Sequence, residues 1–130
     1  MCYTFENEIK LACREAQKSP HAQKHGCVVM NHRGKVLARG YNRWPPYSTI
    51  EGYLQKVRYH KDIEGCSFHA EVATYYRIPK RFRKDLILLV VRSKGNNLKN
   101  SKPCANCQTF IRNKNIRVYY SDDNGAIRRG

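Results

Sequence analysis

The chain has few acidic side chains. Only 10 of its 130 residues are Asp or Glu, against 25 Lys and Arg, and the formal net charge is +15. Such a balance favours anionic partners, among them nucleotide phosphates, RNA, DNA and acidic lipid. The alternative is a solvated basic surface that only keeps the protein soluble. We expect an anionic substrate or ligand.

Long hydrophobic runs are also missing. The longest run, Leu86 to Val91, has six residues, whereas a helix that crosses a bilayer needs about 20. The first residues lack the basic segment followed by an apolar one that is typical of a signal peptide. We therefore expect no membrane partner and a reducing cytoplasmic location. In such a compartment a close cysteine pair binds metal more often than it forms a disulfide.

The chain shows no internal repeat and no low-complexity segment. Hydrophobic residues make up 41% of it, which is enough to bury a core and excludes a wholly disordered chain. A length of 130 residues suits one domain. We expect a single domain over residues 1–130, in which 122–130 is a candidate flexible tail.

Hydrophobic spacing predicts the element order α-β-β-α-β-α-β. The expected helices cover 5–16, 69–77 and 104–113, and the expected strands cover 27–30, 35–41, 86–92 and 117–121. The stretch 42–66 is typical of a long polar loop, with a short helix around 53–59. A hairpin followed by crossover helices predicts an α/β fold, a three-layer α/β/α sandwich with a mixed sheet of four to five strands.

Two short motifs lie where helices are expected to begin. Cys104 and Cys107 are three positions apart, so on a helix both sulfurs can reach one ion. Pro103 precedes them, as proline often does at a helix start, where unpaired N–H groups favour thiolates. His69 and Glu71 begin the preceding helix. There a histidine nitrogen can supply a third ligand, and the carboxylate can lie beside a water molecule.

The joint pattern His69-Ala70-Glu71 and Pro103-Cys104-Ala105-Asn106-Cys107 resembles the signature of zinc nucleobase deaminases. The resemblance, to the cytidine and deoxycytidylate deaminase superfamily, runs from about residue 8 to residue 121 and includes 12–19, 25–29 and 34–42. It implies a Zn²⁺ cofactor held by His69, Cys104 and Cys107. It also implies hydrolytic removal of a base's exocyclic amine, in which zinc acidifies water and Glu71 carries the proton.

The resemblance leaves the substrate open. We expect the cytosine of a free nucleotide such as deoxycytidylate, and the alternative is a base within RNA or DNA. Members of this superfamily often form oligomers, so a homo-oligomer is a further expectation.

Four residues are candidates for contact with the substrate. Asn42 ends the expected hairpin, where the resemblance implies a contact to a ribose hydroxyl, which an amide can both donate to and accept from. The alternative is an ordinary turn residue. Ala70 lies inside the metal motif. Trp44 and Tyr120 are aromatic candidates for stacking on a base, although one of the adjacent pair Tyr119 and Tyr120 is expected in the core.

Three groups of cations accompany the site in the sequence. Arg39 and Arg43 flank Asn42, a second group precedes Cys104, and a third follows the helix that begins at His69. The second group is Lys94, Lys99 and Lys102, and the third lies within 79–84. We expect the first two groups to border a pocket and the third to lie at the far end of its helix. This placement predicts a substrate that carries phosphate.

A structural zinc module that docks on nucleic acid is the main alternative. Cys66 and His69 form a C-x-x-H pair, and together with Cys104 and Cys107 they could close a four-ligand site. That interpretation leaves Glu71 without a role. The fourth ligand, a Cys66 sulfur or a water molecule, distinguishes the two.

Overall fold

A computed structural model describes residues 5–43 and 69–130. The helix expected around 53–59, Trp44 and Cys66 lie outside these residues. The elements are α1 (Glu6–Gln17), β1 (Lys24–Met30), β2 (Val36–Tyr41), α3 (Ala70–Tyr75), the 3₁₀ helix η3 (Lys80–Phe82), β3 (Ile87–Lys94), β4 (Asn97–Lys99), α4 (Ala105–Asn113), β5 (Arg117–Ser121) and β6 (Ile127–Arg129).

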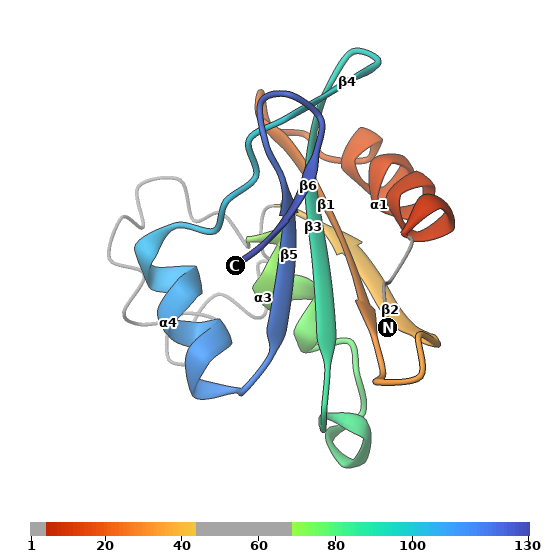
Figure 1. The fold of residues 1–130 in the computed structure, drawn as a ribbon, viewed down its shortest axis with the longest axis vertical. Helices are drawn as coiled ribbons and strands as arrows, with labels where there is room; N and C mark the ends of the chain where they lie inside the picture. The colour runs from red at the N-terminus through yellow and green to blue at the C-terminus, as the bar shows by residue number, and fades with distance from the viewer. Residues whose placement is uncertain (1–4, 44–68) are drawn as a thin grey trace.

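The strands form one mixed sheet in the order β2-β1-β3-β5-β6, with β4 paired to β3 (Figure 1). β3 and β5 run parallel and are joined through α4, because a parallel pair needs a crossover connection. The other pairs are antiparallel. The predicted mixed sheet is confirmed. The three-residue strands β4 and β6 bring it to six strands, and each is too short to leave a period-two pattern in the sequence.

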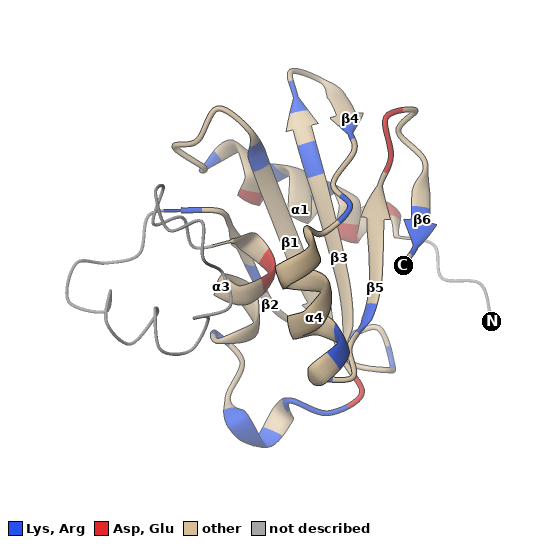
Figure 2. Ribbon diagram, turned by 90° about the vertical axis from the view of Figure 1, so that its left-hand side faces the viewer, with Lys and Arg blue, Asp and Glu red and all other residues tan. Residues whose placement is uncertain are grey.

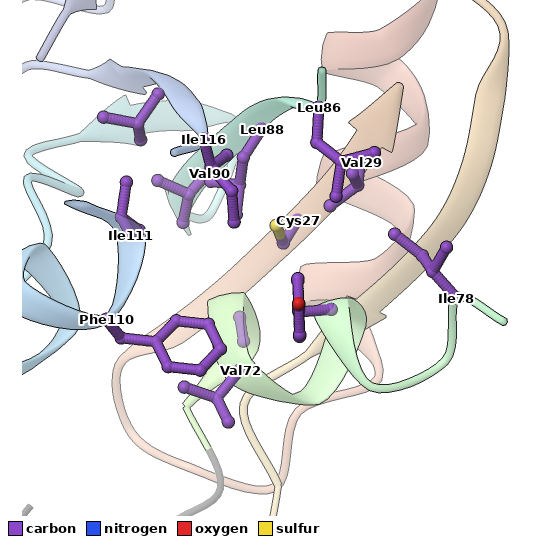
Figure 3. Packing of buried hydrophobic residues seen from close by; sticks show 13 residues of the cluster. Cys27, Val29, Val72, Ile78, Leu86, Leu88, Val90, Phe110, Ile111 and Ile116 are labelled. Carbon is purple, nitrogen blue, oxygen red and sulfur yellow. The ribbon is translucent and has the colours of Figure 1, made fainter. Parts of the chain in front are cut away.

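Alternate residues of the central strands face opposite layers. On β1, Cys27 and Val29 pack against α3 and α4, whereas Val28 and Met30 pack on the α1 side. Figure 3 shows the first set with Val72 of α3 and Phe110 of α4. Two apolar faces on each central strand explain the continuous hydrophobic run of β3. The predicted α/β/α layering follows from this alternation.

α1 lies unusually close to the sheet. A Cβ atom at Gly26 of β1 would lie 1.8 Å from the Ala12 carbonyl oxygen, so only glycine allows this approach. Beside this contact, Glu15 of α1 is buried and lies 3.7 Å from the Arg39 guanidinium of β2. This face of the sheet is closed by packing.

The C-terminal segment 122–130, a candidate flexible tail by its sequence, forms a turn and the short strand β6. The Asp122 carboxylate accepts hydrogen bonds from the backbone of Asn124 and Ala126, and its other oxygen lies 2.6 Å from Arg128. These bonds form a turn that brings β6 back against β5. A turn that is closed by one polar side chain leaves no periodic spacing of apolar residues in the sequence. Hydrophobic spacing therefore does not predict β6. No helix among the described residues is long and apolar enough to cross a membrane.

Candidate metal centre and its cavity

The first turns of α3 and α4 meet at the predicted metal motif. His69 precedes α3 in extended backbone, and its carbonyl accepts the amide of Ala73 at 2.9 Å. Cys104 is the N-cap of α4, where its sulfur accepts the amide of Cys107 at 3.5 Å. Residues at these positions project beyond the helix, so ligands from two helices can converge on one point.

The three candidate ligands lie close together. His69 Nδ1 is 3.2 Å from Cys107 Sγ and 3.9 Å from Cys104 Sγ, and all three ligand atoms lie within 4.8 Å of one another. A tetrahedral zinc ion with bonds of about 2.0–2.3 Å separates such nitrogen and sulfur atoms by roughly 3.5 Å. The donor set and the distances therefore fit zinc. This is the cluster that the sequence predicted.

The two thiols differ in environment. A hydrogen bond from Cys107 lowers the pKa of Cys104, which burial opposes. The same bond, together with burial and the charge of Glu71, raises the pKa of Cys107. These pKa shifts favour the thiolate at Cys104 and the neutral thiol at Cys107. Because a cysteine ligand to zinc must be deprotonated, metal binding here is coupled to proton release.

Glu71 lies beside the ligands in the first turn of α3. It is 4% exposed and shares a hydrogen bond with the Cys107 thiol. Figure 2 shows the acidic segment of α3 next to α4. A buried carboxylate at this place is costly unless it is paired or does chemistry, which fits the predicted catalytic role.

The ligands open onto a cavity of about 550 Å³. Among the predicted residues, its wall includes His69, Ala70, Glu71, Cys104 and Asn42. The remaining wall is rich in groups that bind anions or donate hydrogen bonds, namely His21, His25, Arg92, Asn100, Ser101 and Lys102. Among the described residues of this wall, Glu71 is the one acidic side chain, whereas Arg92 and Lys102 are cations. An anionic group would therefore meet a largely positive surface.

Two of these wall residues are histidines that sequence reasoning did not assign to the site. Burial lowers the pKa of His25, partly opposed by the charge of Glu71. Burial also lowers the pKa of His21. Both imidazoles therefore favour the neutral form, in which each ring has one donor and one acceptor. A weak signal for His25 in the sequence is its position directly before the glycine of β1.

Asn42 lies on the cavity wall with its amide already engaged. Its Oδ1 accepts the His25 amide at 2.9 Å, and its Nδ2 donates to the Gln23 carbonyl at 2.8 Å. One N–H and one lone pair remain for another partner. Asn42 therefore fixes the start of β1 to the end of β2, in addition to its predicted contact with the sugar.

Tyr120 does not line this cavity. It lines a second cavity of about 460 Å³, which shares Lys102 and Pro103 with the first. Its neighbour Tyr119 packs on the α1 side, 4.9 Å from the ring of Phe5. The alternation along β5 therefore separates the two tyrosines between opposite faces of the sheet.

Only some of the predicted cations line the cavity of the metal centre. Lys102 lines the cavity, but Lys94 and Lys99 lie on the β3–β4 hairpin and do not. Arg39 pairs with Val28 in the register and faces α1, where it meets Glu15. Arg43 is not among the lining residues. The group within 79–84 forms η3, beyond the C-terminal end of α3 as expected.

A buried serine pair fixes the segment that carries Lys102 and Cys104. Ser101 Oγ lies 2.8 Å from both the Val90 carbonyl and Ser121 Oγ, and it accepts the Ser121 amide at 2.8 Å. The Ser101 amide donates to the Ser121 carbonyl. These bonds hold the approach to α4 against the ends of β3 and β5, so the metal motif has a defined position before any ligand binds.

Comparison with known proteins agrees with this geometry. The chain matches the family described as the cytidine and deoxycytidylate deaminase zinc-binding region over residues 4–121. No curated protein sequence matches it significantly. A crystal structure of cytidine deaminase from Burkholderia pseudomallei is similar, with a TM-score of 0.65 and 17% identity over 98% of this chain and 92% of that chain.

At 17% identity the structural likeness shows the fold, and the family match extends it to the site. The matched residues include His69, Glu71, Cys104 and Cys107, which the fold brings together. The chain belongs to the cytidine and deoxycytidylate deaminase zinc-binding family.

Proposed function

We propose that this deaminase acts on the cytosine of a phosphate-bearing nucleotide, and that Lys102 and Arg92 bind the phosphate. Both cations line the cavity of the metal centre. Neither has an ion pair among the described residues. Unneutralised cations beside a reaction centre favour an anionic substrate over a neutral nucleoside. This observation carries the proposal.

Zinc held by His69, Cys104 and Cys107 would activate water for attack on the base. Glu71, buried beside the ligands, accepts a proton from the water molecule. It delivers this proton to the ring nitrogen, then takes the second proton from the hydroxyl group added to the carbon and passes it to the departing amine. The carbon gains a bond to oxygen and loses its bond to nitrogen, so that ammonia leaves and uracil remains.

The other wall residues would orient the substrate. Asn42 has one N–H and one lone pair free for a sugar hydroxyl. Ala70 is buried between the candidate metal ligand His69 and the acid–base residue Glu71, and its small side chain leaves room for a flat ring. His25 lies at the same wall as a largely neutral donor and acceptor. Such a set holds a nucleotide by its sugar and base edges.

An ammonia-release assay tests the proposal. We expect kcat/KM for deoxycytidylate to exceed that for deoxycytidine by at least about tenfold, since a charge-assisted hydrogen bond contributes about 1.5–3 kcal/mol. Lys102→Gln should remove most of this difference by raising KM. Lys99→Gln is the matched control, because Lys99 belongs to the same segment but does not line the cavity. Equal turnover of nucleoside and monophosphate would overturn the proposal.

A base within RNA or DNA is the second candidate. The observation in its favour is the second cavity, which adjoins the first at Lys102 and Pro103. A polynucleotide would use many cations and show a steep dependence on salt, whereas a monophosphate needs one or two. The salt dependence of kcat/KM for an oligonucleotide distinguishes the candidates.

A further inference from the structure

Three connections of the chain meet at the end of the sheet where β3 begins. Met30 at the end of β1 pairs with Val36 of β2 and with Ile87 of β3. Ile87 in turn pairs with Arg117 of β5. The β1–β2 turn, the segment between α3 and β3 and the segment between α4 and β5 therefore lie at one end of the sheet (Figure 1). Since α3 and α4 both begin at the metal centre, this end lies away from it.

This end of the molecule is strongly basic. Exposed cations lie on all of the connections, namely Arg33, Lys35, Lys80, Arg81, Lys84 and Lys114. None of them takes part in the ion pairs that the described residues form. Asp85 is the one acidic side chain on these connections. Figure 2 shows the basic residues of η3 near those at the ends of α4 and β5. Because neighbouring strands lie about 4.8 Å apart, these charges can act together on one partner.

Phe82 lies within this basic surface. Its side chain is 48% exposed, and it is the exposed large hydrophobic residue among those described. It ends η3, and the Arg81 guanidinium lies 4.8 Å from the centroid of its ring. A single exposed ring is common on proteins, but this ring has cations on both sides of it in the chain. We call Phe82 and the exposed cations of the connections the basic end.

The turn that carries Phe82 is held in place by its neighbours. Arg83 Nε donates to the Ile78 carbonyl at 2.8 Å, and the Arg83 guanidinium lies 4.8 Å over the Tyr75 ring. The Phe82 amide donates to the Pro79 carbonyl at 2.9 Å. Arg83 therefore serves the fold, and the ring of Phe82 is presented on an ordered turn. A partner that contacts the ring does not have to order it first.

The chemistry of the basic end selects among anionic partners. A second copy of this chain offers little to meet it, because the chain has 10 acidic residues against 25 Lys and Arg. A nucleic acid strand binds in a basic groove where successive bases stack on several aromatic rings, whereas here one ring lies on a projecting turn (Figure 1). An anionic bilayer suits a projecting turn, since cations meet its headgroups while an apolar ring enters the boundary below them.

We propose that the basic end docks this deaminase on the surface of a membrane that contains anionic lipid. Phe82 enters the boundary between headgroups and acyl chains, and Lys80, Arg81 and Lys84 meet the anionic headgroups. The cations of the other two connections add long-range attraction. The metal centre, at the opposite ends of α3 and α4, stays open to its substrate. This inference does not depend on which compound is deaminated.

The proposal also goes beyond what the hydrophobic runs of the sequence predict. The lack of a run long enough to span a bilayer is the reason to expect no membrane partner. Docking on the surface of a bilayer needs no such run, because apolar contact at the interface and attraction to anionic lipid together supply the binding. The basic end has both of these elements.

Sedimentation of the full chain, loaded with zinc, with lipid vesicles tests the proposal. One set of vesicles contains phosphatidylcholine alone, and the other contains equal parts of phosphatidylcholine and phosphatidylserine. We expect binding to the mixed vesicles to be tighter by at least about tenfold and to weaken as salt is added. Lys80→Gln combined with Lys84→Gln should lower this binding by roughly twentyfold, because each cation near such a surface contributes about a factor of five.

Two other lysines supply the matched control. Lys94→Gln combined with Lys99→Gln removes the same charge from the β3–β4 hairpin, at the opposite end of β3. This variant should bind the mixed vesicles nearly as tightly as the wild-type protein, because charges far from a bilayer surface are screened. Melting temperature and ammonia release without vesicles should be unchanged in both double variants, since none of the four lysines lines the cavity of the metal centre.

The aromatic ring is tested separately from the charge. Phe82→Ser keeps every cation and should lower binding to the mixed vesicles by about tenfold. Phe82→Trp should bind like the wild-type protein, and brominated lipid should quench its fluorescence more strongly than that of the wild type. The wild-type protein carries Trp44 and therefore gives the background.

Three results would overturn the proposal. The first is equal binding to the two kinds of vesicle, and the second is tight binding that survives the loss of Lys80 and Lys84. The third is binding to mixed vesicles that Phe82→Ser leaves unchanged, because attraction of charge alone would then explain it. A single-stranded oligonucleotide supplies the opposing probe. If it binds through Lys80, Lys84 and Phe82 while the mixed vesicles do not, the basic end docks on nucleic acid and the proposal fails.

Discussion

The two faces of the sheet use the same kinds of residue for different purposes. On the α1 face, the buried carboxylate of Glu15 contacts Lys18 at 2.7 Å and Arg39 at 3.7 Å. On the α3–α4 face, the buried Glu71 lies beside metal ligands, and Lys102 and Arg92 have no acidic partner among the described residues. Charge is balanced within the first face and left available to a ligand on the second. The comparison separates residues that hold the fold from residues that act.

The largest expected effect is the loss of kcat when the buried Glu71 is replaced, with the buried Glu15 as its control. Glu71→Gln should lower kcat by about 10³-fold, the range of a lost general acid–base, while zinc and the melting temperature are retained. Glu15→Gln should leave kcat unchanged and cost about 1 kcal/mol of stability, since its partners are half exposed. Zinc analysis, calorimetry and ammonia release check both variants. A fully active Glu71→Gln protein would remove the distinction between the faces.

Removal of one metal ligand is expected to come next. Cys104→Ala should lose zinc and activity together, because two ligands bind zinc far more weakly than three. Cys13→Ala on α1 should keep both, since Cys13 lies on the other face. The measurement is the zinc content of the purified proteins, followed by activity after zinc is added. Retention of zinc by Cys104→Ala would show that other residues complete the site.

The packing of α1 can be tested at Gly26. Alanine there would place Cβ against a backbone oxygen that cannot rotate away, so we expect a loss of about 3 kcal/mol and a melting temperature lower by roughly 10 °C. Gly34→Ala is the control, because its φ of +85° strains alanine but nothing lies within 4 Å. That change should cost about 1 kcal/mol. Equal losses would mean that α1 moves freely on the sheet.

The serine pair links stability to the site. Ser101→Ala leaves the buried Ser121 amide without its partner, which should cost about 1–3 kcal/mol. Because Ser101 holds the segment of Lys102, KM for deoxycytidylate should rise by a larger factor than kcat falls. Ser93→Ala, on the exposed end of β3, should change neither constant. A loss of stability with unchanged KM would assign Ser101 a purely structural role.

The smallest expected effect is the loss of stability at low pH that the protonation of His25 causes. Burial lowers its pKa in the folded protein, so the unfolded chain takes up the proton first as the pH falls. Stability from the neutral imidazole is therefore complete above about pH 6.5 and is lost progressively below it. His25→Gln should reduce the fall in melting temperature between pH 7 and pH 5. An identical fall in both proteins would contradict this assignment.

The sequence by itself determined the chemistry of this protein. The candidate ligands His69, Cys104 and Cys107 and the proposed acid–base residue Glu71 lie in two motifs of three to five residues, each at the start of a helix. Pro103 marks the second of these starts. Such local signals can be recognised in the sequence without knowledge of the fold. The continuous apolar run of β3 is a second local signal, because such a run requires cover on both faces of the sheet.

The tertiary structure decided which residues surround that chemistry. Arg39 faces α1 while Lys102 faces the cavity, and Tyr120 lines a second cavity rather than the first. The Ser101–Ser121 pair joins residues 20 positions apart. These facts depend on strand register and on crossover connections. A one-residue change of register exchanges the two faces of a strand, and no short motif records which register the folded chain adopts.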